Sequence, residues 1–281
     1  MEYEKRTDLA LDNASVLKNQ KSKDWEMCRY YSNGIECIKV DILTKNGESA
    51  YKRKIGTYIT LVCGKIEFLD EMGLENVAQA LCDCIKETSK AQTQDRSFLI
   101  VGLGNRLMRS DSLGPSCIEK IGLYESKGKL YLLSPGVASQ SGIESKELIK
   151  CAISATGATN LILIDSLATS SIDRLCSTIQ ISSTGLCPGS GTNGSRERIS
   201  EEELGIPIVS IGVPTVISGT GIILDAISEC NIEKVPTCVY NFANNHSSLL
   251  VSPSEIDIII SSASEVISKA IVESTKNPLQ A

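Results

Sequence analysis

The feature that most constrains this chain is the alternation, from residue 98 onward, of short apolar runs with stretches of helical spacing. The apolar runs cover residues 98–103, 131–133, 160–164, 177–181 and 205–212. The expected helices cover residues 112–121, 143–155, 219–230 and 252–269. Because strands that alternate with helices build sheets covered on both faces, the sequence predicts an α/β fold with a mainly parallel central sheet and helices on both faces. Added N-terminal strands are expected over residues 35–43 and 56–63, with a helix over 74–88.

The composition argues against several classes of function. The net charge of −6 gives no electrostatic attraction for nucleic acid. No apolar run approaches the roughly 20 residues that a membrane span needs, so no membrane association is expected. The 11 cysteines show no paired spacing and no signal peptide precedes them. We therefore expect a soluble intracellular protein whose thiols are reduced and in many cases buried.

Asp111 and Asp165 are the strongest candidates for chemistry. Each follows an apolar run, and the carboxyl ends of strands are where open α/β sheets gather ligands and reacting groups. Two carboxylates brought together there could share one proton and supply both an acid and a base. The competing interpretation is structural, because aspartate also caps helices, as Asp111 would, and occupies turns at strand ends, as Asp165 would.

Other motifs point to few alternatives. Gly102-Leu-Gly104 follows a strand, but Leu107 stands where the third glycine of a dinucleotide fingerprint belongs, so a tight turn is the better interpretation. A triad or a Cys–His dyad through the single histidine, His246, is conceivable, but a lone loop histidine is usually a surface residue. One histidine and scattered cysteines also argue against a zinc site. We predict no cofactor and no metal. The glycine-rich loop over 184–194 is either a mobile surface loop or a source of backbone N–H groups for a peptide or an oxyanion.

Several short motifs, in order along the chain, resemble the germination protease family, the endopeptidases that degrade small acid-soluble spore proteins. The matching pieces are Arg6-Thr-Asp-Leu-Ala10, Gly102-Leu-Gly-Asn105, Asp111-Ser-Leu-Gly-Pro115, Ser134-Pro-Gly-Val137, Gly142-Ile-Glu144, Ile164-Asp-Ser-Leu-Ala168, Thr178-Ile-Gln180, Thr184-Gly185, Pro188-Gly-Ser-Gly191, Leu204-Gly-Ile-Pro207 and Ile211-Gly-Val-Pro-Thr-Val216. They extend from the start of the chain almost to its last helix.

The resemblance implies an aspartate-dependent protease that is made as a zymogen. Its two essential aspartates fall on Asp111 and Asp165, and its processing site falls between Asp8 and Leu9. Residues 1–8 would then be a short propeptide, and residues 9–281 a single α/β protease domain. The resemblance further implies a core like that of hydrogenase maturation proteases, a homotetramer, small acid-soluble spore proteins as substrates, and a place in the cytoplasm of the forespore or spore core.

Two sets of loop residues are expected to assist the aspartates. Backbone N–H groups would stabilise the oxyanion from one or both of two loops, represented by Gly104, Asn105 and Arg106 and by Gly189, Ser190 and Gly191. Arg106, Arg109 or Arg196 could hold the acidic residue before the cut, although for any single one of them a solvated surface charge is the more common role.

The chain departs from the family at two carboxylates. Ser183 and Ser218 stand where family members usually carry aspartate. This motivates an alternative function, a non-catalytic paralogue that holds extended peptides in the same cleft. A third interpretation, metal-dependent hydrolysis, would use Asp111 and Asp165 as ligands together with other carboxylates.

Overall fold

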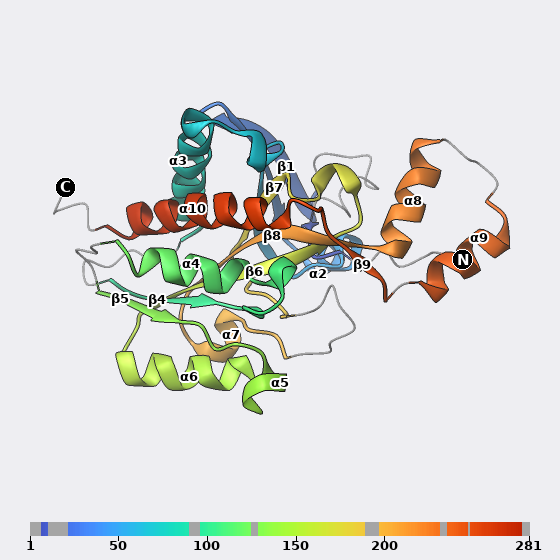
Figure 1. The fold of residues 1–281 in the computed structure, drawn as a ribbon. Helices are drawn as coiled ribbons and strands as arrows, with labels where there is room; N and C mark the ends of the chain where they lie inside the picture. The colour runs from blue at the N-terminus through green and yellow to red at the C-terminus, as the bar shows by residue number, and fades with distance from the viewer. Residues whose placement is uncertain are drawn as a thin grey trace.

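The computed structural model describes residues 7–10, 22–89, 96–124, 129–188, 197–230, 235–246 and 248–276. Within this part of the chain, nine strands form one sheet in the order β1-β2-β3-β7-β8-β6-β4-β5, with β9 paired to β8 (Figure 1). The strands are β1 (Trp25–Ser32), β2 (Ile35–Ile42), β3 (Gly56–Val62), β4 (Ser97–Gly102), β5 (Lys129–Leu133), β6 (Asn160–Thr169), β7 (Thr178–Ser182), β8 (Ile208–Ser218) and β9 (Leu250–Val251).

Helices cover both faces of this sheet, as predicted. The α-helices are α2 (Lys45–Tyr51), α3 (Glu71–Thr88), α4 (Leu113–Ile121), α5 (Ala138–Ser141), α6 (Ser145–Thr156), α7 (Glu201–Leu204), α8 (Gly219–Glu229), α9 (Thr237–Asn245) and α10 (Ile256–Thr275). Three 3-10 turns are η1 (Ile66–Phe68), η2 (Arg109–Asp111) and η3 (Ile172–Arg174). One apolar cluster joins the sheet to α3, α4 and α10, and a second lies on the opposite face under α6 and α7 (Figure 1).

The sheet divides into a parallel and an antiparallel half. The α/β fold and the added N-terminal strands are confirmed, and β5, β4, β6 and β8 run parallel. The other half, from β7 through β3 and β2 to β1, is antiparallel throughout. No long helical crossover of the kind that parallel strands require lies between β6 and β7, so β7 runs back antiparallel to the strands beside it.

β6 is longer than the sequence predicts. The apolar run suggests an end at Ile164, with Asp165 just beyond it, but the strand continues to Thr169 because β8 pairs alongside it to Ile217. β4 stops earlier, since its last pair with β6 joins Gly102 and Ile164. Asp165 therefore stands at the level where β4 ends, inside a strand rather than after one.

The helix predicted over residues 74–88 is confirmed as α3, because its cap and its apolar spacing both lie within its own sequence. It begins three residues earlier, at Glu71, because the Asp70 side chain accepts a hydrogen bond from the Gly73 N–H and caps the helix. Val77, Leu81 and Ile85 form its buried stripe, as their spacing predicts. Residues 25–32, 45–51 and 237–245 form β1, α2 and α9, which were not predicted.

Six of the 11 cysteines are buried, namely Cys37, Cys63, Cys82, Cys84, Cys117 and Cys176, and all 11 are free thiols. Burial raises the pKa of Cys63 to about 12, and burial raises the pKa of Cys176 to about 12 as well. Thiols of this kind stay protonated and behave as small apolar side chains. They contribute to the core rather than to a reactive site.

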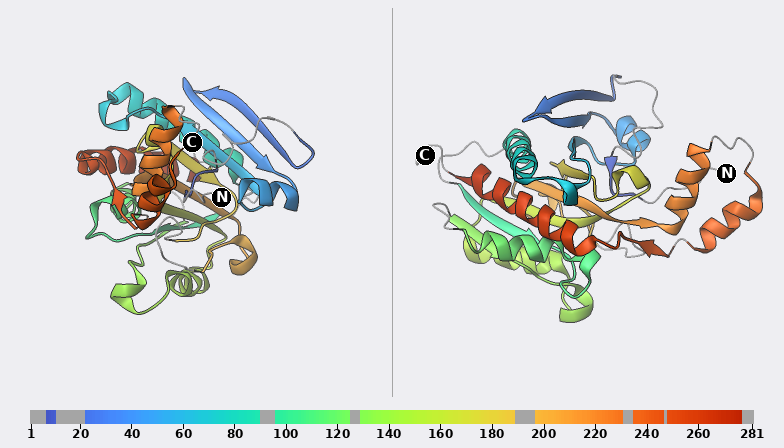
Figure 2. Two further views of the ribbon diagram at one scale, coloured as in Figure 1. Left: turned by 90° about the vertical axis from the view of Figure 1, so that its right-hand side faces the viewer. Right: turned by 45° about the horizontal axis from the view of Figure 1, so that its top comes forward.

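At one end of the molecule, α8 and α9 form an arm that extends beyond the sheet (Figures 1 and 2). Phe242 on α9 and Leu249 after it are 57% and 54% exposed. Among the described residues, none of the helices combines the length and apolarity needed to cross a membrane.

Candidate functional site

Two adjoining pockets lie where β6 and β8 pass the end of β4. The smaller, here called the aspartate pocket, has a volume of about 170 Å³ and is lined by Asp8, Asp111 and Asp165 together with Gly104, Ser166 and Thr215 among others. The larger, here called the basic pocket, has a volume of about 650 Å³. Asp8, Asp165 and Leu167 line both pockets, so the two form one continuous cleft. The structure thus brings together both predicted catalytic aspartates and the aspartate at the predicted processing site.

A tight loop after β4 holds Asp111. The Asn105 N–H donates to both the backbone carbonyl and the Oδ2 of Asp111, each at 2.9 Å. The Asn105 side chain in turn accepts from the Leu107 N–H at 3.0 Å. Thr215 on β8 donates its hydroxyl to the Ser110 carbonyl at 2.6 Å and fastens the loop to the sheet. Asp111 lies in η2, and Ser112 rather than Asp111 is the N-cap position of α4.

Glycines allow this loop to sit close against β4 and α4. A Cβ at Gly104, whose φ is +112°, would lie 2.1 Å from the Asp111 carbonyl oxygen. A Cβ at Gly114 would lie 2.2 Å from the Leu103 carbonyl oxygen, and one at Gly102 would lie 2.2 Å from that of Gly114. The motif Gly102-Leu-Gly104 therefore serves a close backbone approach, as the sequence indicates, and its local purpose is to place Asp111.

Asp165 is more deeply buried than Asp111. Its side chain is on the central strand β6, and only 6% of the residue is exposed. One carboxylate oxygen accepts from the Ser166 N–H at 3.0 Å. Within the part of the chain that the structure describes, Asp165 lies inside a strand rather than in a turn, and α4 has Ser112 at its N-cap position with no side-chain cap.

The segment 7–10 is docked in the cleft, with a bend at Asp8. The Asp8 N–H donates to the Ala168 carbonyl, and the Ala168 N–H donates to Asp8 Oδ2, both at 2.8 Å. Leu9 is fully buried and Ala10 is 1% exposed. Arg53 donates from its guanidinium to the Thr7 carbonyl. The Asp8–Leu9 bond, predicted as the processing site, is thus held beside the pocket of Asp111 and Asp165.

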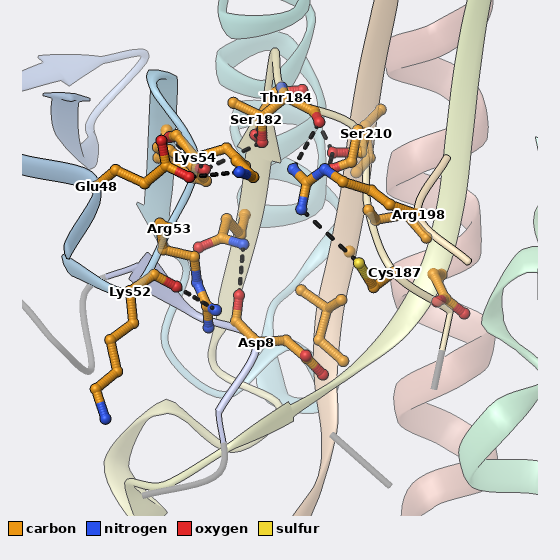
Figure 3. A pocket seen from close by; sticks show the side chains of 18 of the residues that line it. Asp8, Glu48, Lys52, Arg53, Lys54, Ser182, Thr184, Cys187, Arg198 and Ser210 are labelled. Carbon is orange, nitrogen blue, oxygen red and sulfur yellow. Dashed lines mark hydrogen bonds and ion pairs between the residues drawn. The ribbon is translucent and has the colours of Figure 1, made fainter. Parts of the chain in front are cut away.

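The basic pocket carries the cations that sequence reasoning missed. Its described lining includes five cationic side chains, Lys45, Lys52, Arg53, Lys54 and Arg198, against three acidic ones, Asp8, Glu48 and Asp165 (Figure 3). Lys54 is paired with Glu48 at 2.5 Å, and Arg198 donates to the Thr184 carbonyl at 2.7 Å. The run Lys52-Arg-Lys54 was visible in the sequence, but its place beside the cleft depends on the pairing of β3 with β7.

Tyr58 lies at the floor of the basic pocket. Burial raises the pKa of its phenol, and its hydroxyl accepts a hydrogen bond from Thr184 at 3.1 Å. Nearby Arg198 and Arg53 act in the opposite direction on this pKa, through their positive charge. Tyr58 therefore remains a neutral group in this pocket near pH 7, able to donate or accept a hydrogen bond.

The structure does not bring the other predicted cations to the cleft. Arg106 pairs with Glu119 at 2.7 Å and Arg109 with Asp257 at 2.9 Å, both on the exposed surface, and neither lines the two pockets. The surface alternative considered for them is the one observed. Gly104 does line the aspartate pocket, whereas the Asn105 N–H is directed to Asp111. Gly189, Ser190, Gly191 and Arg196 lie outside the described residues.

The two serines that replace family aspartates have structural roles here. Ser218 is the N-cap of α8, where its hydroxyl accepts from the Gly221 N–H at 3.0 Å. Ser183 accepts from the Thr57 N–H at 3.1 Å. Serine and aspartate are nearly equivalent at an N-cap. Neither serine lines the cleft, so neither replacement removes a carboxylate from it.

No group of three or more His, Cys, Asp or Glu side chains spaced to bind a metal occurs within the described ranges. His246 lies on the arm, where its ring stacks on Phe242, with the ring centroids 4.2 Å apart. The cleft as described offers carboxylates, cations and amide groups. Its chemical capacity is that of acid–base catalysis on a bound peptide.

Comparison with known proteins gives a consistent result along most of the chain. The family model for germination proteases matches residues 5–230. A germination protease of Caldanaerobacter subterraneus is 32% identical, with 95% of this chain and 92% of that protein aligned. One from Bacillus pumilus is 34% identical over 80% of this chain and 67% of its own length. One from Clostridium perfringens is 29% identical over 96% of this chain and 94% of its own.

Among solved structures, a hydrogenase maturation protease from Thermococcus kodakarensis aligns with 70% of this chain and 99% of its own, at 19% identity and a TM-score of 0.42.

Proposed function

This chain belongs to the germination protease family, and on that premise we propose that it is an aspartate-dependent endopeptidase that initiates degradation of small acid-soluble spore proteins during germination. Family membership establishes the coarser statement, a protease role in spore germination. The observation that carries the finer one is the shared pocket of Asp111 and Asp165, with Asp8 in its lining. Asp8, whose carbonyl belongs to the proposed scissile bond, lines the same pocket as these two carboxylates.

In the proposed reaction, the two aspartates hold one proton between them. The ionised carboxylate takes a proton from water while the water oxygen adds to the carbonyl carbon before the scissile bond, and the carbonyl electron pair moves onto its oxygen. When the C=O re-forms, the C–N bond breaks and the leaving nitrogen takes a proton from the carboxylic acid. One proton enters the pair and one leaves it, so the pair returns to its starting state. The two titrate as a unit, and we assign neither as the permanent acid.

The proposed preference for an acidic residue before the cut is supported by the contacts of Asp8. Its carboxylate accepts from a main-chain N–H of β6, and the cationic side chains of the basic pocket lie beside it. Hydrogen bonds from backbone N–H groups to a carboxylate are charge-assisted and strong. A positive pocket wall also attracts acidic peptides to the cleft.

We propose that residues 1–8 are a propeptide and that the chain is made as a zymogen. The support is the docked segment 7–10, which presents the Asp8–Leu9 bond and at the same time occupies the cleft that an external substrate would need. The proposed enzyme acts in the cytoplasm of the forespore or spore core and assembles as a homotetramer. The α8–α9 arm, with Phe242 and Leu249 exposed, provides a surface suited to contact another copy.

The non-catalytic alternative is less well supported than the sequence suggests. It was motivated by Ser183 and Ser218, and these serve as backbone hydrogen-bond partners outside the cleft. The decisive experiment incubates protein that begins at Leu9, with the proposed propeptide removed, with a synthetic peptide that copies residues 3–14 and follows the products by chromatography. Wild-type protein should cut the peptide after the aspartate that corresponds to Asp8. The Asp111→Asn and Asp165→Asn variants should each lose at least about 100-fold in rate.

Two outcomes would reject the proposal. Peptide that is bound by the wild-type protein but stays intact would support the non-catalytic paralogue instead. Cleavage by either asparagine variant at the wild-type rate would remove the two-aspartate mechanism. A parallel arm with a strong chelator addresses metal-dependent hydrolysis, and full activity in that arm is the expected result.

A further inference from the structure

Gln180 makes the two most informative contacts with the docked segment. Its Nε2 donates to the Asp8 carbonyl oxygen at 3.1 Å, and its Oε1 accepts from the Ala10 N–H at 2.7 Å (the first contact is drawn at Asp8 in Figure 3). The Asp8 carbonyl belongs to the very bond proposed to be cut. We propose that the Gln180 side-chain N–H is the oxyanion donor of this protease. We also propose that its Oε1 accepts a hydrogen bond from the backbone N–H of the second residue after the cut. This inference rests on the proposed function.

The sheet places Gln180 opposite Asp165 across one strand. Gln180 pairs with Gly212 on β8, and Gly212 pairs with Asp165 on β6, so the three residues form one row across the sheet. Residues directly paired in this way project from the same face. Because adjacent strands lie about 4.8 Å apart, the two functional residues begin roughly 10 Å from each other. That distance leaves room for an extended peptide backbone between them.

Gly212, in the middle of this row, has no side chain that would project between Asp165 and Gln180. All three residues of the row line the basic pocket, as does Asp8. A Cβ at Gly212 would lie 2.5 Å from the Leu167 side chain, which covers that position. A larger residue at 212 would displace Leu167 toward the bound segment. The row is therefore shaped so that Asp165 and Gln180 approach the same peptide from two sides.

The orientation of the Gln180 amide is set by its partners. A backbone N–H can only donate and a backbone carbonyl can only accept, so Oε1 must face Ala10 and Nε2 must face Asp8. The residue is 7% exposed and lies on β7, which is paired on both edges, with β3 and with β8. A donor fixed in this way needs little reorganisation when charge develops on the carbonyl oxygen.

The chemical role follows from the addition of water described above. As the carbonyl electron pair moves onto oxygen, the Nε2–H bond to that oxygen becomes charge-assisted and strengthens, which lowers the barrier without any change in the proton count. Loss of one such donor typically lowers kcat by about 100- to 1000-fold. Loss of a purely binding contact would instead raise KM and leave kcat unchanged.

The test uses two variants that differ in which amide atom they retain. Gln180→Glu keeps an acceptor for the Ala10 N–H and, once ionised, presents oxygen in place of the donor; its kinetics are therefore followed from pH 6 to pH 9, because burial and nearby carboxylates raise the pKa of a carboxyl at this position. Gln180→Leu removes both groups. Gln79→Leu is the control, because Gln79 is on α3, lines neither pocket and bonds only Asp83 among the hydrogen bonds of the described residues. Cleavage of the peptide copying residues 3–14 is measured with protein that begins at Leu9, and cleavage of the tethered Asp8–Leu9 bond is measured in the full chain.

We expect Gln180→Glu and Gln180→Leu to lower kcat by about 100- to 1000-fold and to slow tethered cleavage by a similar factor. The control variant Gln79→Leu should cleave at the wild-type rate. Unchanged kcat with a raised KM, or tethered cleavage at the wild-type rate, would overturn the assignment. If Gln180→Leu fails to fold, as its thermal unfolding would reveal, Gln180→Glu still decides the matter. If wild type itself leaves the peptide intact, the proposed function has failed rather than the role of Gln180.

The second half of the inference has its own probe, a peptide in which the alanine two residues after the cut is N-methylated. The wild-type enzyme should show a KM raised by about fivefold or more, since the methyl group removes the N–H that Oε1 accepts. Gln180→Leu should discriminate much less between the two peptides. Equal discrimination by wild type and Gln180→Leu would show that a group other than Gln180 accepts the hydrogen bond from this N–H.

Discussion

At the scale of single residues, the position of Asp111 depends on a glycine that has no chemistry of its own. Gly104 adopts a φ of +112°, and a Cβ there would meet the backbone carbonyl of Asp111 at 2.1 Å. We expect Gly104→Ala to lower the free energy of unfolding by more than about 2 kcal/mol and to reduce peptide cleavage further than that loss explains, because Asp111 must move. Thermal unfolding and kcat on the same preparation measure both effects.

Gly142→Ala is the matched control for that substitution. Gly142 also has positive φ, at +72°, but a Cβ there would have no atom within 4 Å. We expect a loss of about 1–2 kcal/mol from the left-handed backbone alone, with kcat unchanged. If both variants lose activity to the same degree, Gly104 is a backbone requirement and does not position Asp111.

The sequence predicted site residues where their position depended on strand ends and missed them where it depended on strand pairing. Asp111 and Asp165 follow apolar runs, and the carboxyl ends of neighbouring parallel strands meet. Arg53 and Gln180 reach the cleft because β3 and β7 pair antiparallel beside β8, and no local signal specifies that pairing. Gln180 belongs to the family motif Thr178-Ile-Gln180, yet only its contacts with Asp8 and Ala10 indicate a role.

At the scale of secondary-structure elements, α10 secures α4 through a small polar cluster. Lys120 bonds Glu265 at 2.8 Å and the Ser261 carbonyl at 2.9 Å, and Tyr124 donates to Glu265 at 3.0 Å. The hydrogen bond from Lys120 lowers the pKa of Glu265, with a further contribution from Tyr124. A carboxylate whose pKa is lowered on folding stabilises the protein above its unfolded pKa and loses that contribution as the pH falls through the folded pKa.

Glu265→Gln should therefore destabilise the protein at pH 7 but not in acid. We expect a loss of about 0.5 kcal/mol, because this ion pair is half exposed and screened by solvent. The difference from wild type should shrink as the pH falls below about 4.3, the usual value for glutamate. Urea unfolding at several pH values measures it. A difference that grows in acid would contradict the assigned charge state.

Helices were easier to predict than strand order. α3, α4, α6, α8 and α10 each carry an apolar stripe or a local end signal within their own sequence. The length of β6 was underestimated because the polar residues Asp165, Ser166 and Thr169 read as the end of a strand, whereas pairing with β8 continues the strand through them. Residues that serve the site interrupt the apolar pattern by which strands are recognised.

At the scale of the whole molecule, the proposed tetramer gives a direct expectation for the mass in solution. One chain is 30.2 kDa, so four chains give about 121 kDa. Light scattering after size-exclusion chromatography should return this value, and Phe242→Asp on the exposed arm should lower it. A wild-type mass near that of one chain would refute the tetramer without affecting the cleft.

In the proposed zymogen the docked segment occupies the cleft, so that the same fold would serve first as an inactive precursor and then as a catalyst. Segment 7–10 bonds β6 through Asp8, is buried at Leu9, and places the proposed scissile carbonyl on Gln180. The same backbone contacts would serve an external acidic peptide once the segment has left. Self-processing and substrate cleavage are then one reaction on two peptides.

The most direct measurement is a time course of intact mass for the purified full chain and its two aspartate variants. Wild-type protein should lose residues 1–8 and acquire Leu9 as its new N-terminus, while Asp111→Asn and Asp165→Asn should keep their full mass over the same period. Loss of residues 1–8 from either variant at the wild-type rate would contradict the claim that these two carboxylates hydrolyse the Asp8–Leu9 bond.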